Sequence, residues 1–128
     1  MIGYLTLGSN DIDRSLAFYD ALMAELGAKR LMSSDEGQAF TFYGTAMDRP
    51  MVAICRPFDG EAARPGNGPM VGLAAKSREQ VDRVHAAALE LGAQDEGAPG
   101  IRPPEDMGFY GAYFRDPDGN KLCVFVTG

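Results

Sequence analysis

The stretch Arg115-Asp116-Pro117-Asp118-Gly119-Asn120-Lys121-Leu122-Cys123-Val124-Phe125 decides the fold of this chain. Its first half favours a turn, because Pro117 fixes φ, Gly119 accepts a positive φ, and Asp and Asn side chains can bond to their own backbone. Aromatic residues precede the turn at 110–114, and an almost wholly apolar run follows it at 122–126. The stretch therefore predicts a hairpin of two strands, at least one of which is buried.

The composition indicates one globular domain, residues 1–128. Of these 128 residues, 45% are hydrophobic and 23% are charged, which is enough to form one buried core. A formal net charge of -6 argues against nucleic acid or an anionic membrane as a partner, since both attract basic surfaces. No apolar run approaches the roughly 20 residues of a membrane span, and the N-terminus lacks a signal-peptide pattern. We therefore expect a cytoplasmic protein with a small-molecule partner.

The chain carries an internal repeat, in which Leu26-Gly27-Ala28 recurs as Leu91-Gly92-Ala93. Each copy ends a helix at its glycine, and the helices begin at Ser9-Asn10-Asp11 and at the capping box Ser77-Arg78-Glu79-Gln80. Strands are expected over 2–7, 28–33, 38–43, 51–56, 70–74 and 93–95 and in the final hairpin.

This repeat predicts two β-α-β-β-β modules. Module one covers 1–57, a Gly- and Pro-rich linker covers 58–68, and module two covers 69–128. One module cannot cover its own sheet, so we expect the two to pack as a pair around a cleft. A long Gly/Pro loop is expected over 96–108, and loops of this length are usually functional or mobile.

The final turn, placed one strand from the C-terminus, resembles the last hairpin of the glyoxalase, bleomycin-resistance protein and extradiol dioxygenase superfamily, also called the vicinal oxygen chelate superfamily. The first-helix phrase at 11–19 and the capped second helix resemble that family too, so the likeness covers essentially the whole chain. It implies an α+β fold of two tandem βαβββ modules forming a cup-shaped, mixed eight-stranded sheet with the helices outside. It leaves the function open, because this family uses one cup for lyases, dioxygenases, epoxide-opening transferases and drug-binding proteins.

The family's metal ligands are missing at the corresponding positions. The resemblance matches its two first-strand His residues to Tyr4 and Met70 and its last-strand Glu to Cys123, while the fourth ligand falls within 53–55. These residues do not replace His and Glu for Fe, Mn, Ni or Mg. The single histidine, His85, falls in a helix, where we expect it to be half-exposed. We predict no metal and no cofactor; Cu(I) on Met70 and Cys123 is the soft-ion alternative.

The predicted cup is apolar and aromatic with a few hydroxyls and thiols, which is typical of a preformed binding pocket. Alternation along the strands places Tyr4 and Cys123 on one face and directs Leu5 and Leu122 to the helices. Arg102 is included because, like Arg56 and Arg115, it could clamp an acidic ligand. The ligand-binding residues that we predict are Tyr4, Thr6, Phe42, Cys55, Met70, Arg102, Tyr113, Cys123 and Phe125.

Two functions from different classes remain open at this point. The first is a metal-free protein that binds a small aromatic or amphipathic molecule in the cup, similar to the antibiotic-sequestering members of the family. The second is an enzyme, either a metal-dependent lyase or dioxygenase of the glyoxalase I type or a metal-free enzyme that uses Tyr and Arg in acid-base chemistry. No catalytic residue is assigned in either case. The family resemblance also implies a homodimer.

Overall fold

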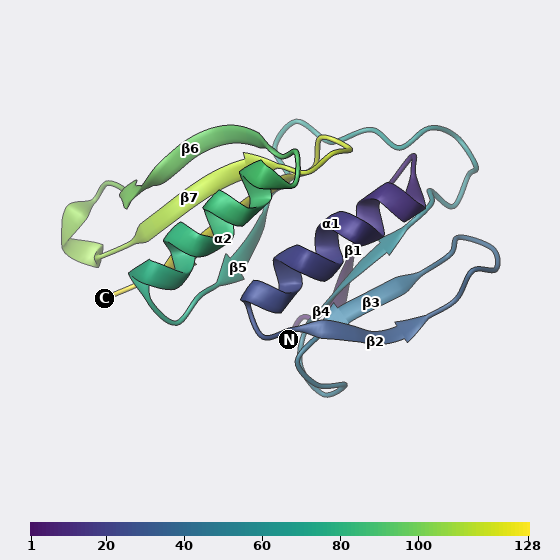
Figure 1. Cartoon of the computed structure of the whole chain (residues 1–128), viewed down its shortest axis with the longest axis horizontal. Helices are drawn as coiled ribbons and strands as arrows, with labels where there is room; N and C mark the ends of the chain where they lie inside the picture. Colours follow the sequence, from purple (N-terminus) through teal and green to yellow (C-terminus); the bar gives the residue numbers. More distant parts are fainter.

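The computed structural model describes all 128 residues as two similar halves, each with one helix and one four-stranded sheet (Figure 1). The first half contains β1 (Tyr4–Gly8), α1 (Ile12–Glu25), β2 (Lys29–Ser33), β3 (Thr41–Gly44) and β4 (Met51–Cys55). The second contains β5 (Val71–Ala74), α2 (Arg78–Glu90), β6 (Gln94–Ile101), the short 3-10 helix η1 (Glu105–Met107), β7 (Tyr110–Arg115) and β8 (Lys121–Val126).

The strand orders are β1-β4-β3-β2 in the first sheet and β5-β8-β7-β6 in the second. In each sheet the first strand pairs in parallel with the last, and the other pairs are antiparallel. The α+β class and the two tandem βαβββ modules are confirmed. The eight strands form two mixed sheets of four, however, and no backbone hydrogen bond joins β1 to β5.

Both helices begin and end where the sequence predicts. The Asp11 side chain accepts a hydrogen bond from the Arg14 N–H, and the Ser77 side chain accepts one from the Gln80 N–H. The Gln80 side chain accepts its bond from the Lys76 N–H, one residue before the cap, so the capping box is displaced by one residue. Gly27 and Gly92 follow the helices with positive φ values of 75° and 99°, a conformation that glycine adopts without strain.

The core lies between the helices and the sheets and extends through both halves. Leu7 and Ile54 of the first sheet and Leu122 and Val124 of the second belong to one cluster of 15 buried residues, and Leu5 packs against it. Figure 1 shows both helices on the same side of the two sheets. Because side chains alternate along a strand, the residues between these core positions lie on the opposite side, which we call the open face.

The Asp-Pro-Asp-Gly-Asn turn also joins the two halves. The Asp116 carboxylate, 4% exposed, accepts a hydrogen bond of 2.6 Å from the hydroxyl of Tyr19 in α1. Asn120 donates its side-chain amide to the Gly8 carbonyl at 3.0 Å, and Asp118 accepts the Asn10 N–H at 2.9 Å. The turn is therefore both the predicted hairpin corner and a polar joint between the halves.

The loop expected over 96–108 is shorter than predicted, because β6 continues to Ile101. Its pairing with β7 is irregular on both sides of Gly97, and these irregularities explain why the strand pattern is hidden in the sequence. Neither helix of the structure has the length and apolar character needed to cross a membrane.

Candidate functional site

On the first sheet, the open face is an aromatic surface. The Tyr4 ring meets the Phe42 ring edge-on at 5.3 Å, and Phe42 stacks on Phe40 at 5.8 Å. Tyr4 is 57% exposed and its hydroxyl has no hydrogen-bond partner in the chain, so this hydroxyl is free to bond a ligand. Thr6 lies beside it on β1 and is exposed, whereas Cys55 is buried at the end of β4.

The second-half part of the open face is built around Cys123. Its backbone partners are Gly72 on β5 and Tyr113 on β7, and its side chain is only 1% exposed. Two residues along β8, the Phe125 ring stacks on Phe109 at 5.2 Å with an interplanar angle of 8°. Phe125 also lies over Gly72, since a Cβ built on Gly72 would come within 3.2 Å of the Phe125 ring.

Two cations lie over the ring of Tyr113. The Arg102 guanidinium carbon is 5.2 Å from the ring centre, and the Lys121 ammonium is 5.7 Å from it. Lys121 is two residues before Cys123, and strand alternation therefore places both on the open face. The sequence analysis included Arg102 and Tyr113 but missed Lys121, although the same alternation rule identifies it.

The predicted residues form two groups on this face. One contains Tyr4, Thr6, Phe42 and Cys55, and the other contains Arg102, Tyr113, Cys123 and Phe125. Met70 lies just before β5, is 47% exposed and lines a small hollow with Leu7 and Lys121. Contacts between rings, and between a ring and a cation, occur within each group, and none of these joins one group to the other. The open face therefore has two halves. The aromatic half belongs to the first sheet and contains Tyr4 and Phe42. The cationic half belongs to the second sheet, where Arg102 and Lys121 accompany the Cys123 thiol and further aromatic rings.

The thiols of this face are not activated nucleophiles. Burial raises the pKa of the Cys55 thiol above its usual value. Burial also raises the pKa of Cys123, although a hydrogen bond with Tyr113 and the charges of Arg102 and Lys121 oppose the shift. Because both pKa values are raised, both thiols are neutral at neutral pH. Only the thiolate attacks or binds metal, so both groups are unreactive.

The donor atoms do not fit the metal of the family that the sequence resembles. The resemblance matches Tyr4, Met70 and Cys123 to the family's His, His and Glu, and Ala53 and Cys55 are the open-face residues at the end of β4. No three His, Cys, Asp or Glu side chains lie close enough together to hold a metal ion. Neutral thiol, thioether and phenol groups are poor ligands for hard divalent ions.

Three residues considered in the sequence analysis lie elsewhere or are already paired. His85 is 5% exposed and its Nε2 lies 3.1 Å from the Asp95 carboxylate, so the expectation of a half-exposed histidine was wrong. Arg115 donates to Glu96 at 2.8 Å and to the Gly119 carbonyl, and it is thus neutralised. Arg56 lines hollows beside the start of α1, on the helix side of the sheet.

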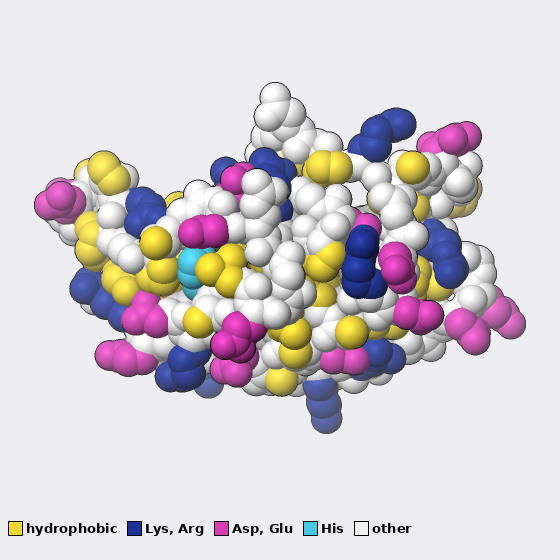
Figure 2. Space-filling view, turned by 45° about the horizontal axis from the view of Figure 1, so that its top comes forward, with side chains coloured by type: hydrophobic (Ala, Val, Ile, Leu, Met, Phe, Trp, Pro, Cys, Tyr) yellow, Lys and Arg dark blue, Asp and Glu magenta, His cyan; other side chains and the backbone are white.

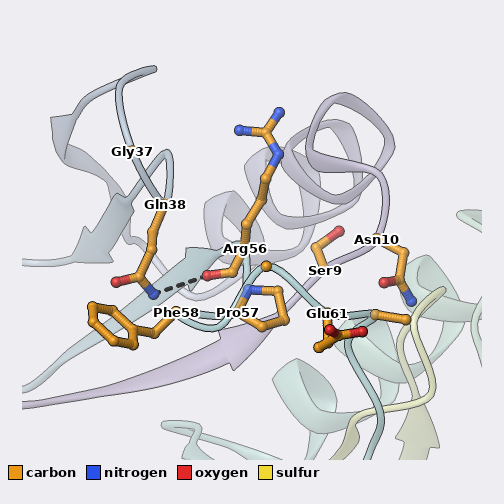
Figure 3. Close-up of a pocket in the computed structure, with 10 residues that line it drawn as sticks. Ser9, Asn10, Gly37, Gln38, Arg56, Pro57, Phe58 and Glu61 are labelled. Atoms are coloured by element: carbon orange, nitrogen blue, oxygen red, sulfur yellow. Dashed lines mark hydrogen bonds between the residues drawn. The ribbon is translucent and has the colours of Figure 1, made fainter.

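A polar hollow of about 560 Å³ lies at the ends of β1 and β4, outside the open face (Figure 3). Figure 3 shows the Arg56 guanidinium and the Phe58 ring pointing to opposite sides, with the Gln38 amide bound to the Arg56 carbonyl at 2.9 Å. The exposed connection at 57–62 forms one wall. Only 2 of its 10 lining residues are hydrophobic, and none of them is a predicted ligand-binding residue.

An apolar cleft of about 430 Å³ is lined by residues of both halves of the chain. Its walls include Leu5 of β1, Leu26 after α1, and Val71, Gly72 and Leu73 of β5. The cleft lies between the two halves, and Gly72 belongs both to its wall and to the open face.

The chain has known relatives. A sequence profile of the Glyoxalase/Bleomycin resistance protein/Dioxygenase superfamily matches residues 1–124. A solved glyoxalase/bleomycin resistance protein from Albidiferax ferrireducens T118 is 37% identical, with a TM-score of 0.85 over 98% of each chain. No curated protein matches the chain.

Two more distant structures show likeness of the fold alone. A glyoxalase/bleomycin resistance protein/dioxygenase family enzyme from Burkholderia phytofirmans PsJN is 18% identical, with a TM-score of 0.76 over 98% of each chain. A lactoylglutathione lyase from Agrobacterium tumefaciens is 22% identical, with a TM-score of 0.68 over 98% of this chain and 92% of that one.

Proposed function

The chain belongs to the glyoxalase/bleomycin resistance protein/dioxygenase superfamily, and from that premise we propose that it binds a small aromatic or amphipathic molecule on the open face, without a divalent metal. One observation carries this proposal. The face on which the superfamily is expected to bind its ligands presents the partly exposed rings of Tyr4, Phe42, Tyr113 and Phe125 in place of His and Glu donors. Aromatic rings with a few polar groups are typical of sites for small molecules.

The proposal is tested by titrating isotope-labelled protein with the planar aromatic probes 2-naphthoate and 2-naphthamide. Chemical-shift changes are expected at Thr6, Phe42, Cys123 and their neighbours on the open face. Changes confined to the polar hollow near Arg56 or to the helices would place the site elsewhere and would refute the proposal.

Replacing Tyr4 by Phe is expected to weaken binding of 6-hydroxy-2-naphthoate, a probe with a second polar group, by about 1 kcal/mol, because one hydrogen bond between the Tyr4 hydroxyl and the hydroxyl of the probe is lost. The exposed Tyr4 hydroxyl has no partner in the chain, so the fold should be unaffected, as circular dichroism will show. Calorimetric titration measures the affinity. An unchanged affinity would leave Tyr4 as a wall residue only.

The purified protein is expected to bind no stoichiometric divalent metal. The reason is the set Tyr4, Met70 and Cys123, which offers neither imidazole nor carboxylate. After dialysis against Zn, Ni, Mn and Fe salts, plasma-emission analysis should find far less than one ion per chain. Near one ion per chain, removable only by strong chelators, would contradict this expectation.

The protein is expected to form a homodimer. Its surface exposes Ile2, Met47 and, at 91% exposure, Phe58, and a twofold contact would cover such apolar surface. Sedimentation equilibrium at micromolar concentration should give twice the mass of the chain. A monomer under these conditions would count against the expectation.

We also propose a cytoplasmic protein that binds no nucleic acid. Both cysteines are free thiols, which suits a reducing compartment. The formal net charge is -6, and the side of the molecule in Figure 2 carries acidic and basic side chains interspersed, with no continuous basic area. Nucleic-acid partners require such an area.

A further inference from the structure

Arg102 and Lys121 stand out among the basic side chains without an ion pair because their two charges lie together over one ring of the open face. The sequence has 18 Asp and Glu against 12 Lys and Arg, and five ion pairs occupy other basic groups. Neither Arg102 nor Lys121 belongs to an ion pair, and both lie over Tyr113 on the open face. Arg115, on the same sheet, is neutralised by Glu96.

The backbone of β6 holds the Arg102 side chain in place. Its Nη2 donates to the carbonyl of Ala98, and its Nη1 and Nη2 lie against Gly100 and Gly97. A Cβ built on Gly100 would come within 3.0 Å of the guanidinium, and one built on Gly97 within 3.2 Å. The guanidinium therefore occupies space that side chains at these two positions would take. The guanidinium is therefore fixed before any ligand arrives, which lowers the entropy cost of binding.

We propose that Arg102 and Lys121 form an anion-binding subsite, and that the ligand of the open face is a planar aromatic carboxylate. This inference rests on the proposed function and adds the chemical class of the ligand. The guanidinium fork matches the two oxygens of a carboxylate, and Lys121 adds a second positive charge. Phe125 follows Lys121 on β8, and its ring stacks on that of Phe109. This pair of rings contacts the aromatic body of the ligand.

The decisive experiment compares two probes of nearly the same shape, 2-naphthoate and the neutral 2-naphthamide, by calorimetric titration. The wild-type protein is expected to bind 2-naphthoate about tenfold more tightly than 2-naphthamide, the usual gain from a charge-assisted hydrogen bond. Arg102→Gln should remove this preference and leave the affinity for 2-naphthamide within about twofold. Lys121→Gln should reduce the preference by a smaller factor, since Lys121 acts as a point charge.

Arg56→Gln is the matched control. Arg56 is also free of any ion pair but lies on the helix side of the sheet, so its replacement should change neither affinity. Thermal unfolding of each variant checks that the fold is kept. Raising the salt concentration should weaken 2-naphthoate binding and leave 2-naphthamide binding unchanged.

The outcomes separate this subsite from the function on which it rests. Equal affinity of the wild-type protein for both probes, or equal weakening of both by Arg102→Gln, would overturn the subsite while leaving an aromatic-binding face intact. Failure of both probes to bind the wild-type protein would overturn the proposed function together with the subsite.

Discussion

Replacing Asp116 by Ala is expected to lower the free energy of unfolding by about 4 kcal/mol, a large effect for one substitution. The buried carboxylate accepts hydrogen bonds from the Tyr19 hydroxyl, from the N–H groups of Asp118 and Asn120, and from the Asn120 side chain. Its removal leaves the hydroxyl of Tyr19, which is fully buried, without a partner. Urea unfolding followed by circular dichroism measures the loss.

Tyr19→Phe and Asp48→Ala are the comparison variants. Tyr19→Phe removes one of these hydrogen bonds and should cost about 1 to 2 kcal/mol, and the double variant should cost less than the sum because the two groups share a bond. Asp48 is exposed in a turn, and its replacement should be nearly neutral. An Asp116→Ala variant as stable as Asp48→Ala would show that the turn does not hold the two halves together.

The sequence predicted those parts of the fold that repeat along the chain. Alternation placed Leu5 and Leu122 towards the helices, and both pack in the core as expected, because a one-residue slip would expose the apolar face of each strand. The helix ends at Gly27 and Gly92 were likewise predicted, since the cap geometry depends on local residues.

Features that depend on partners far along the chain could not be predicted. His85 is buried because Asp95, on the neighbouring β6, supplies its hydrogen bond, and helical spacing alone does not reveal that strand. Asp116 and Tyr19 are 97 positions apart in the sequence. The turn sequence therefore predicted the hairpin but not the hydrogen bond that joins it to α1. Lys121 was overlooked for another reason: a charged residue at a strand end is usually attributed to the solvent-exposed surface.

The position of the ligand on the open face gives the second large effect. Gly72→Leu is expected to abolish binding of 2-naphthoate and 2-naphthamide alike while the protein stays folded. Gly72 lies on β5 beside Cys123, between the aromatic half and the cationic half of the face, so a leucine there projects into the space that the probe must occupy. The added Cβ comes within 3.2 Å only of the Phe125 ring, the end of a side chain that can shift slightly.

Gly3→Leu is the matched control, because nothing lies within 4 Å of a Cβ built there and Gly3 precedes β1. Its replacement adds the same apolar side chain away from the open face and should leave both affinities unchanged. Gly72→Leu should remove binding of both probes, whereas Arg102→Gln should affect only the anionic one, so the two variants report separately on occupation of the face and on charge recognition. Full retention of binding by Gly72→Leu would mean that the ligand does not lie at the centre of the open face.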